Sequence, residues 1–272
     1  MSSILPLYIQ NEKQWYFISI FYARENWKVL IAEIEHFYQK MQSQFCNCLI
    51  SFSGEKGEHL QLTFATLAND INNYIDEIQV YFQLFIDQNP SVGKIPFPYG
   101  KAVWGNYSNN SIAWYRFKLP NYSDQYINFH QQTMDIALKL LADDFSEDAI
   151  FSVGMYLITK ALCYIENKEQ KSILSQALDD ASGASPHFVY TAKELVNKID
   201  INEIGEIIES YWNEDTNNFS LELVYWLNEV KNLLNLYNFN NLCTFICEIM
   251  GLKGLRQLMI LELMNIWYNK KK

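Results

Sequence analysis

The segment CLISFSGEKGEHLQLTF, residues 48–64, constrains the fold more strongly than any other part of the chain. Two short apolar runs with alternating side chains are joined by a turn that contains two glycines. Such alternation is typical of strands, so the sequence predicts a β-hairpin with strands over 46–53 and 58–65. The second strand places His59, Gln61 and Thr63 on one face and its apolar residues on the other. This polar row is either the solvent-exposed face of the hairpin or the floor of a site.

The flanking segments extend the hairpin into an α+β pattern. A strand is predicted over 15–23, and helical spacing follows over 25–43 and 67–87, which gives the order β-α-β-β-α. Short aromatic strands over 101–107 and 111–119 predict a second hairpin in the middle of the chain. Ser123 and Asp124 can cap the next helix, and the rest of the chain is predicted as helices over 124–142, 147–166, 168–182, 188–199, 202–213, 219–236, 240–250 and 252–269. We therefore expect an α+β fold with a mixed sheet, in one domain over 1–272 with a sheet-bearing part (1–120) and a helical part (121–272).

Composition limits the partners of the chain. The net charge is −10, which argues against nucleic acid as the main partner and favours a peptide or a small molecule. The N-terminal residues lack the features of a signal peptide, and no apolar stretch is long enough to insert stably in a membrane. The five cysteines show no sign of an oxidising compartment. The sequence therefore predicts a cytoplasmic protein with reduced thiols, and it leaves a homodimer open.

Two patterns resemble ligand sites but have simpler interpretations. Cys46 and Cys48 share a strand face, and Cys243 and Cys247 lie one helical turn apart, yet neither pair has the turn-borne spacing of structural zinc sites. The glycine-containing turn at 54–57 connects two strands, whereas a phosphate-binding loop leads from a strand into a helix. We expect no metal and no cofactor.

Two residues are stronger candidates for chemistry. His59 lies on a predicted strand beside Gln61, with Ser51 on the neighbouring strand, and histidine acts as an acid or a base near neutral pH. A lone histidine on a strand more often has a structural role, so that interpretation of His59 stays open. Arg116 is one of only three arginines, and it lies in an aromatic strand where a cation needs a carboxylate from the protein or from a substrate.

Five sequence motifs in order suggest a family. They are Trp15-Tyr16-Phe17, Cys48-Leu49-Ile50-Ser51-Phe52, Gly57-Glu58-His59-Leu60-Gln61-Leu62-Thr63-Phe64, Tyr115-Arg116-Phe117 and Phe129-His130-Gln131-Gln132-Thr133. Their order and spacing resemble the C-terminal, eliminating domain of class I lanthipeptide dehydratases, also called the thiopeptide-type bacteriocin biosynthesis domain. The likeness covers about Trp15 to Leu141, and the helical remainder agrees in kind.

The resemblance implies activities and residues. In that family the domain eliminates glutamate from glutamylated Ser or Thr of a precursor peptide, and standalone relatives form the pyridine ring of thiopeptides by a formal cycloaddition. It implies Arg116 and His59 as catalytic residues, and the further side chains Ser51, Gln61, Thr63, Trp104 and His130 as substrate-binding. It also implies a precursor peptide as substrate and a separate glutamylating protein as partner.

Several departures from the family pattern keep a second hypothesis open. Ser51, Gln61 and Thr63 stand where the family has arginines, and Gln132 replaces an aspartate. No histidine follows His187, although eliminating members use one near the C-terminus, so the general base is unassigned. The first hypothesis is a standalone enzyme of peptide natural-product maturation that catalyses elimination or a related lyase or cyclisation step. The alternative is a catalytically degenerate peptide-binding or scaffolding subunit, and an unrelated α+β protein remains a third interpretation.

Overall fold

The computed structural model describes residues 8–10, 13–41, 43–54, 57–66, 71–93, 107–114, 123–142, 144–215 and 220–271. The chain divides into two compact units, one formed by 1–122 with 143–146 and the other by 123–142 with 147–272. Each unit is described by itself. The expectation that 1–272 form a single domain stays a prediction.

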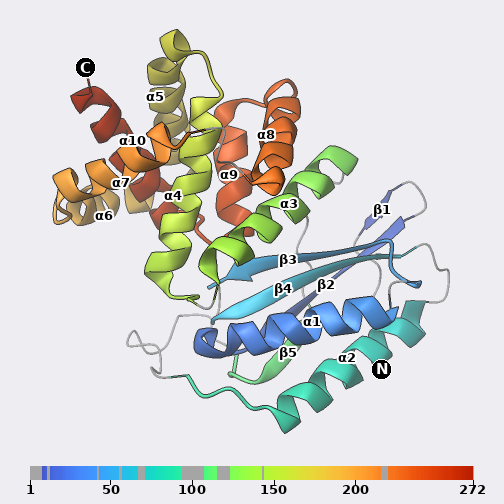
Figure 1. The fold of residues 1–272 in the computed structure, drawn as a ribbon. Coiled ribbons are helices and arrows are strands. Elements are labelled where there is room, and N and C mark those ends of the chain that lie inside the picture. Colours follow the sequence, from blue (N-terminus) through green and yellow to red (C-terminus); the bar gives the residue numbers. More distant parts are fainter. Residues whose placement is uncertain are drawn as a thin grey trace. The chain divides into compact units, whose positions relative to one another are not determined.

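The first unit is built on an antiparallel sheet (Figure 1). Its strands are β1 (Tyr8–Gln10), β2 (Lys13–Phe21), β3 (Asn47–Ser53), β4 (His59–Thr66) and β5 (Ser111–Trp114). The central strands run in the order β2-β4-β3. The edge of β2 away from β4 pairs with β1 near the start of the strand and with β5 near its end. The predicted hairpin is thus the β3–β4 pair, and β4 lies inside the sheet between β2 and β3.

Two helices cover one face of this sheet. After the short 3-10 turn η1 (Arg24–Asn26), α1 spans Trp27–Met41, and α2 spans Ile71–Gln88 (Figure 1). The Trp27 ring stacks on Phe52 of β3, with ring centroids 5.1 Å apart, and Phe37 contacts Phe64 of β4 edge-on. Since side chains alternate along a strand, the even-numbered residues of β4 face the helices and His59, Gln61 and Thr63 point to the opposite face.

The second unit is helical in its described part (Figure 1). Its helices are α3 (Asp124–Leu141), α4 (Glu147–Cys163), α5 (Asn167–Ala184), α6 (Pro186–Val196), α7 (Ile201–Asn213), α8 (Leu221–Leu234), α9 (Phe239–Ile249) and α10 (Leu255–Lys270). Their starts follow from capping chemistry, because Ser123, Ser220 and Asn238 each accept a hydrogen bond from a backbone N–H of the first turn. The predicted cap at Ser123 is confirmed.

The observed elements confirm the α+β class and most predicted spans. All described strand pairings are antiparallel, so the sheet is not mixed in this part of the chain. Of the predicted middle hairpin, the structure describes the strand at 111–114, whereas 101–106 and 115–120 lie outside the described residues. The short strand β1 was not predicted. None of the described helices has the length and apolar character needed to cross a bilayer.

Candidate functional site

The polar row of β4 is buried. His59, Gln61 and Thr63 are only 5%, 8% and 1% exposed, and every described residue of β4 is buried on both faces of the sheet. The row is therefore not a solvent-exposed hairpin face. Because burying polar groups costs free energy unless they are hydrogen-bonded, a continuous polar row inside a sheet is more informative about function than one on a surface.

Strand register adds residues from both neighbours to this row. Gln61 pairs with Ser19 of β2 on one side and with Ser51 of β3 on the other, and all three side chains lie on the face away from α1. Ser19 and Ser51 are buried as well. We call Ser19, Ser51, His59, Gln61 and Thr63 the sheet-face row. They form a set of hydrogen-bonding side chains that spans three strands. Ser19 was missed from the sequence because its strand looked uniformly aromatic and β-branched.

His59 lies where the row reaches the end of the sheet. Its Nδ1 atom is 3.0 Å from the carbonyl oxygen of Gly57, and its ring packs on Phe21, with ring centroids 4.6 Å apart. Tyr107 also stacks on Phe21, with ring centroids 4.7 Å apart. The imidazole is thus held both by a hydrogen bond and by ring packing. This restricts the motion of a group able to transfer protons near neutral pH.

Gly57 has a backbone conformation that permits this arrangement. Its φ is +121°, which side chains of L-residues rarely adopt, and a Cβ there would lie 3.3 Å from the Phe21 ring. Gly57 therefore lets the turn come close to Phe21 and directs its carbonyl oxygen toward His59.

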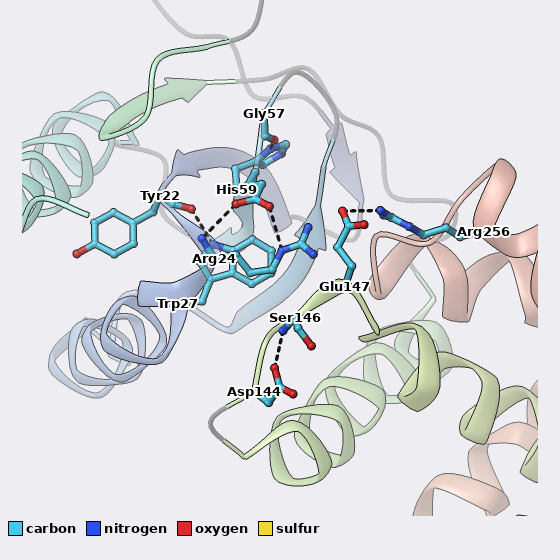
Figure 2. Close-up of polar contacts among 10 residues, drawn as sticks. Tyr22, Arg24, Trp27, Gly57, His59, Asp144, Ser146, Glu147 and Arg256 are labelled. Atoms are coloured by element: carbon cyan, nitrogen blue, oxygen red, sulfur yellow. Dashed lines mark hydrogen bonds and ion pairs between the residues drawn. The ribbon is translucent and has the colours of Figure 1, made fainter. Parts of the chain in front are cut away.

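A partly buried ion pair involves Glu58, which lies next to His59 in the sequence. Arg24 Nε is 3.3 Å from Glu58 Oε1, and the backbone N–H of Arg24 donates to Glu58 Oε2, also at 3.3 Å. The Arg24 guanidinium also lies over the Trp27 ring, 5.3 Å from its centroid. Figure 2 shows Arg24, Trp27, Gly57 and His59 grouped at this end of the sheet. The sequence identified Arg24 only as one of three arginines, since nothing in the pattern pairs it with Glu58.

Of the three remaining predicted site residues, the structure describes only His130. Arg116 and Trp104 lie outside the described residues. His130 belongs to α3 of the second unit, where it is 1% exposed and contacts Tyr126 edge-on, with ring centroids 5.9 Å apart. The roles of these three residues stay predictions. Within the described ranges, no group of three or more His, Cys, Asp or Glu side chains is arranged to hold a metal ion.

No protein-family model matches this sequence, and no curated protein matches it. Among solved structures, the chain is similar to a pyridine synthase, TbtD, from thiomuracin biosynthesis, with a TM-score of 0.61. The alignment covers 94% of this chain and 98% of that chain, with 11% sequence identity. The two chains share a fold. The fold that the resemblance implies is thereby confirmed, whereas the match to the lanthipeptide eliminating domain stays a prediction.

Proposed function

We propose that this protein is an enzyme of ribosomally synthesised peptide maturation that closes a ring in a modified precursor peptide. The observation that carries this proposal is the shared fold, which extends over nearly the whole length of both this chain and a pyridine synthase. A match of that extent makes a chance likeness of one motif or one hairpin a poor explanation. Sequence identity is low, so the reaction is argued from the site.

The sheet-face row fits a reaction that moves protons without releasing a free carboxylate. Its five residues include a histidine able to accept or donate a proton and four neutral side chains able to hydrogen-bond a peptide. Such donors stabilise a partial negative charge on a carbonyl oxygen when they are fixed in a site shielded from water. Ring closure within a peptide needs this kind of support.

Glutamate elimination has a different requirement, because the leaving carboxylate calls for a cation. Two of the three arginines are already engaged: Arg24 pairs with Glu58, and Arg256 Nη2 lies 2.5 Å from Glu147 Oε1 (Figure 2). Arg116 is the remaining one and lies outside the described residues. For elimination, the family resemblance implies Arg116 as the cation, whereas ring closure at the sheet-face row depends on His59. This difference gives a direct test.

The test is mass spectrometry of two peptide substrates incubated with the protein. One substrate is a precursor peptide that carries dehydroamino acids, and the other is the same precursor with glutamylated Ser or Thr. Ring closure predicts that the first peptide is converted, with expulsion of its leader segment, and that His59→Gln slows this conversion about 10²–10⁴-fold. His36→Gln, at an exposed position of α1, is the matched control and should convert the first peptide as fast as the unaltered protein does.

Two other outcomes would replace this proposal. Loss of the glutamate mass from the second peptide, abolished in Arg116→Ala, would identify an eliminating enzyme. Binding of either peptide without any mass change would identify a peptide-binding subunit. One observation favours this last function as the second candidate: Ser51, Gln61 and Thr63 occupy positions where the resembling family has arginines.

A further inference from the structure

The two groups that hold His59 are themselves contacted by the residues that precede β5. Tyr107 stacks on the Phe21 ring at an interplanar angle of 17°, and its carbonyl oxygen lies 3.6 Å from where a Cβ at Gly57 would be. The backbone N–H of Asn110 donates to the carbonyl oxygen of Phe21 at 2.7 Å. One short segment therefore lies against both the ring that packs on His59 and the turn that provides its hydrogen-bond acceptor.

This segment is fastened to the chain beyond α2 through Ser91. The Oδ1 atom of Asn110 accepts hydrogen bonds from the Ser91 backbone N–H at 2.9 Å and from its Oγ at 2.7 Å. The Ser91 carbonyl oxygen accepts from Nδ2 of Asn110 at 2.9 Å and from Nδ2 of Asn109 at 3.0 Å. Ser91 Oγ also accepts from the backbone N–H of Ala23, just after β2, at 2.9 Å. Since Ser91 is only 3% exposed, these hydrogen bonds are largely shielded from water.

Asn110 has an uncommon backbone conformation. Its φ is +60°, in the left-handed region that asparagine enters more readily than most residues with a side chain. Such a conformation persists where the surrounding contacts fix it, and residues of this kind cluster at functional sites. The contacts of Asn110 with Ser91 and Phe21 fix it here.

Tyr107 differs in exposure from the rings near it. Phe21 is 1% exposed and His59 is 5% exposed, whereas Tyr107 is 43% exposed. A half-exposed ring buries less apolar area than a core ring, so truncation of Tyr107 should cost less stability than truncation of Phe21. The effect of Tyr107 on His59 can therefore be measured in a folded protein.

We propose that Tyr107 and Asn110 are positioning residues for His59, and the catalytic importance of this role rests on the ring closure proposed above. Asn110 fixes the place of the segment, and Tyr107 keeps Phe21 and Gly57 in contact with the imidazole. A proton-transferring group must lie within hydrogen-bond reach of the proton that it moves. Loss of this support should therefore slow the chemical step more than it weakens peptide binding.

NMR of the imidazole nitrogens tests the positioning without a substrate. In Tyr107→Ala the two ¹⁵N shifts of His59 should move toward each other, as a mixture of tautomers gives, whereas Tyr107→Phe keeps the stacked ring and should leave them unchanged. Tyr190→Ala removes a ring that is 72% exposed on α6 and is the matched control. Unchanged His59 shifts in Tyr107→Ala overturn the inference.

Steady-state kinetics with the precursor peptide that carries dehydroamino acids separate positioning from binding. Tyr107→Ala and Asn110→Gly should each lower kcat about tenfold with little change in KM, and Tyr107→Phe should retain the full kcat. Asn110→Gly tolerates the positive φ and removes only the side-chain bonds to Ser91. An equal loss in Tyr107→Phe would assign a direct role to the hydroxyl, and a rise in KM alone would assign the ring to peptide binding. Either result overturns the inference.

The two proposals fail in different ways. If the unaltered protein converts no peptide but the His59 shifts change in Tyr107→Ala, ring closure fails and the positioning of His59 stands. If the unaltered protein converts the peptide and Tyr107→Ala does so with the same kcat, ring closure stands and the positioning role fails.

Discussion

The Nδ1 atom of His59 lies 3.0 Å from the carbonyl oxygen of Gly57, two residues earlier in the chain. A carbonyl oxygen only accepts hydrogen bonds, so Nδ1 carries the proton that is shared between them. In the neutral ring the lone pair is then on Nε2, which makes Nε2 the basic atom of the imidazole.

This relationship predicts the tautomer of His59. In ¹⁵N NMR spectra of the imidazole nitrogens above the titration range, His59 should show a protonated Nδ1 and an unprotonated Nε2. The exposed His36 provides a control signal in the same spectrum. A spectrum in which His59 is protonated on Nε2 would contradict the hydrogen bond to Gly57.

Gly57→Ala should destabilise the first unit. A residue with a side chain at φ +121° is strained, and its Cβ would lie 3.3 Å from Phe21, so we expect a loss of about 1–2 kcal/mol in the free energy of unfolding. Gly54→Ala in the same turn is the matched control, because no atom lies within 4 Å of a Cβ at that position. Urea unfolding measures both, and equal effects would show that the positive φ is not important.

The thiols should react in an order set by burial. Cys46 is exposed, whereas burial raises the pKa of the Cys48 thiol from 9.0 to about 12 and that of Cys163 to about 11. At pH 8 a three-unit increase lowers the thiolate fraction about a thousandfold. An aromatic disulfide reagent should therefore modify Cys46 first and Cys48 far more slowly, although the two are separated by a single residue.

The same shifts have a consequence for stability at high pH. A thiol whose pKa is raised on folding favours the folded state below its unfolded pKa, and this contribution is lost as pH rises through its folded pKa. The stability should therefore fall between about pH 9 and pH 12 as Cys48 and Cys163 ionise. Serine in place of both cysteines should reduce that fall in stability. If the pH dependence is unchanged, the fall is caused by the ionisation of other groups.

Glu214→Gln should lower stability more than a comparable change at the surface. Lys160 is 2% exposed and is held by Glu214 Oε2 at 2.8 Å and by the carbonyl oxygen of Tyr211 at 2.5 Å, near the end of α7. Removing the carboxylate takes an ion pair away from a buried cation, which should cost about 1–3 kcal/mol. Glu166→Gln breaks the exposed pair with Lys168 and serves as the control in thermal unfolding. Similar effects of the two changes would contradict a buried role for Lys160.

Gly154→Ala should be destabilising through overpacking between α4 and the turn before α10. A Cβ at Gly154 would lie only 2.3 Å from Leu252 Cδ1, so we expect a cost of about 1–3 kcal/mol in urea unfolding. Shortening the neighbour in the double variant Gly154→Ala/Leu252→Val should recover part of it. Gly183→Ala in α5 meets no atom within 4 Å and should instead leave stability unchanged or slightly higher.

The sequence predicted the elements better than the site. Helix and strand spans follow from local periodicity and caps such as Ser123, which act over a few residues. Local periodicity does not predict that the sheet-face row is buried. The alternation of His59, Gln61 and Thr63 looks the same whether that face is exposed or covered. The pairing of Ser19 with Gln61 depends on register between distant strands, and the Arg24–Glu58 pair depends on where two strands end. Neither relationship is visible in the order of residues.

β2 pairs with β1 and with β5, and these two partners are synthesised at very different times. β1 is made before β2 and can pair with it at once, but the partner of Ile18–Phe21 is Ser111–Trp114. At about 5–20 residues per second, the ribosome needs roughly 5–20 s to make the intervening roughly ninety residues. During this interval an apolar strand edge stays open to pairing with other chains. Overproduction of this protein should therefore lead to aggregation during translation, and slower induction or a chaperone that binds strand edges should raise the yield of folded protein.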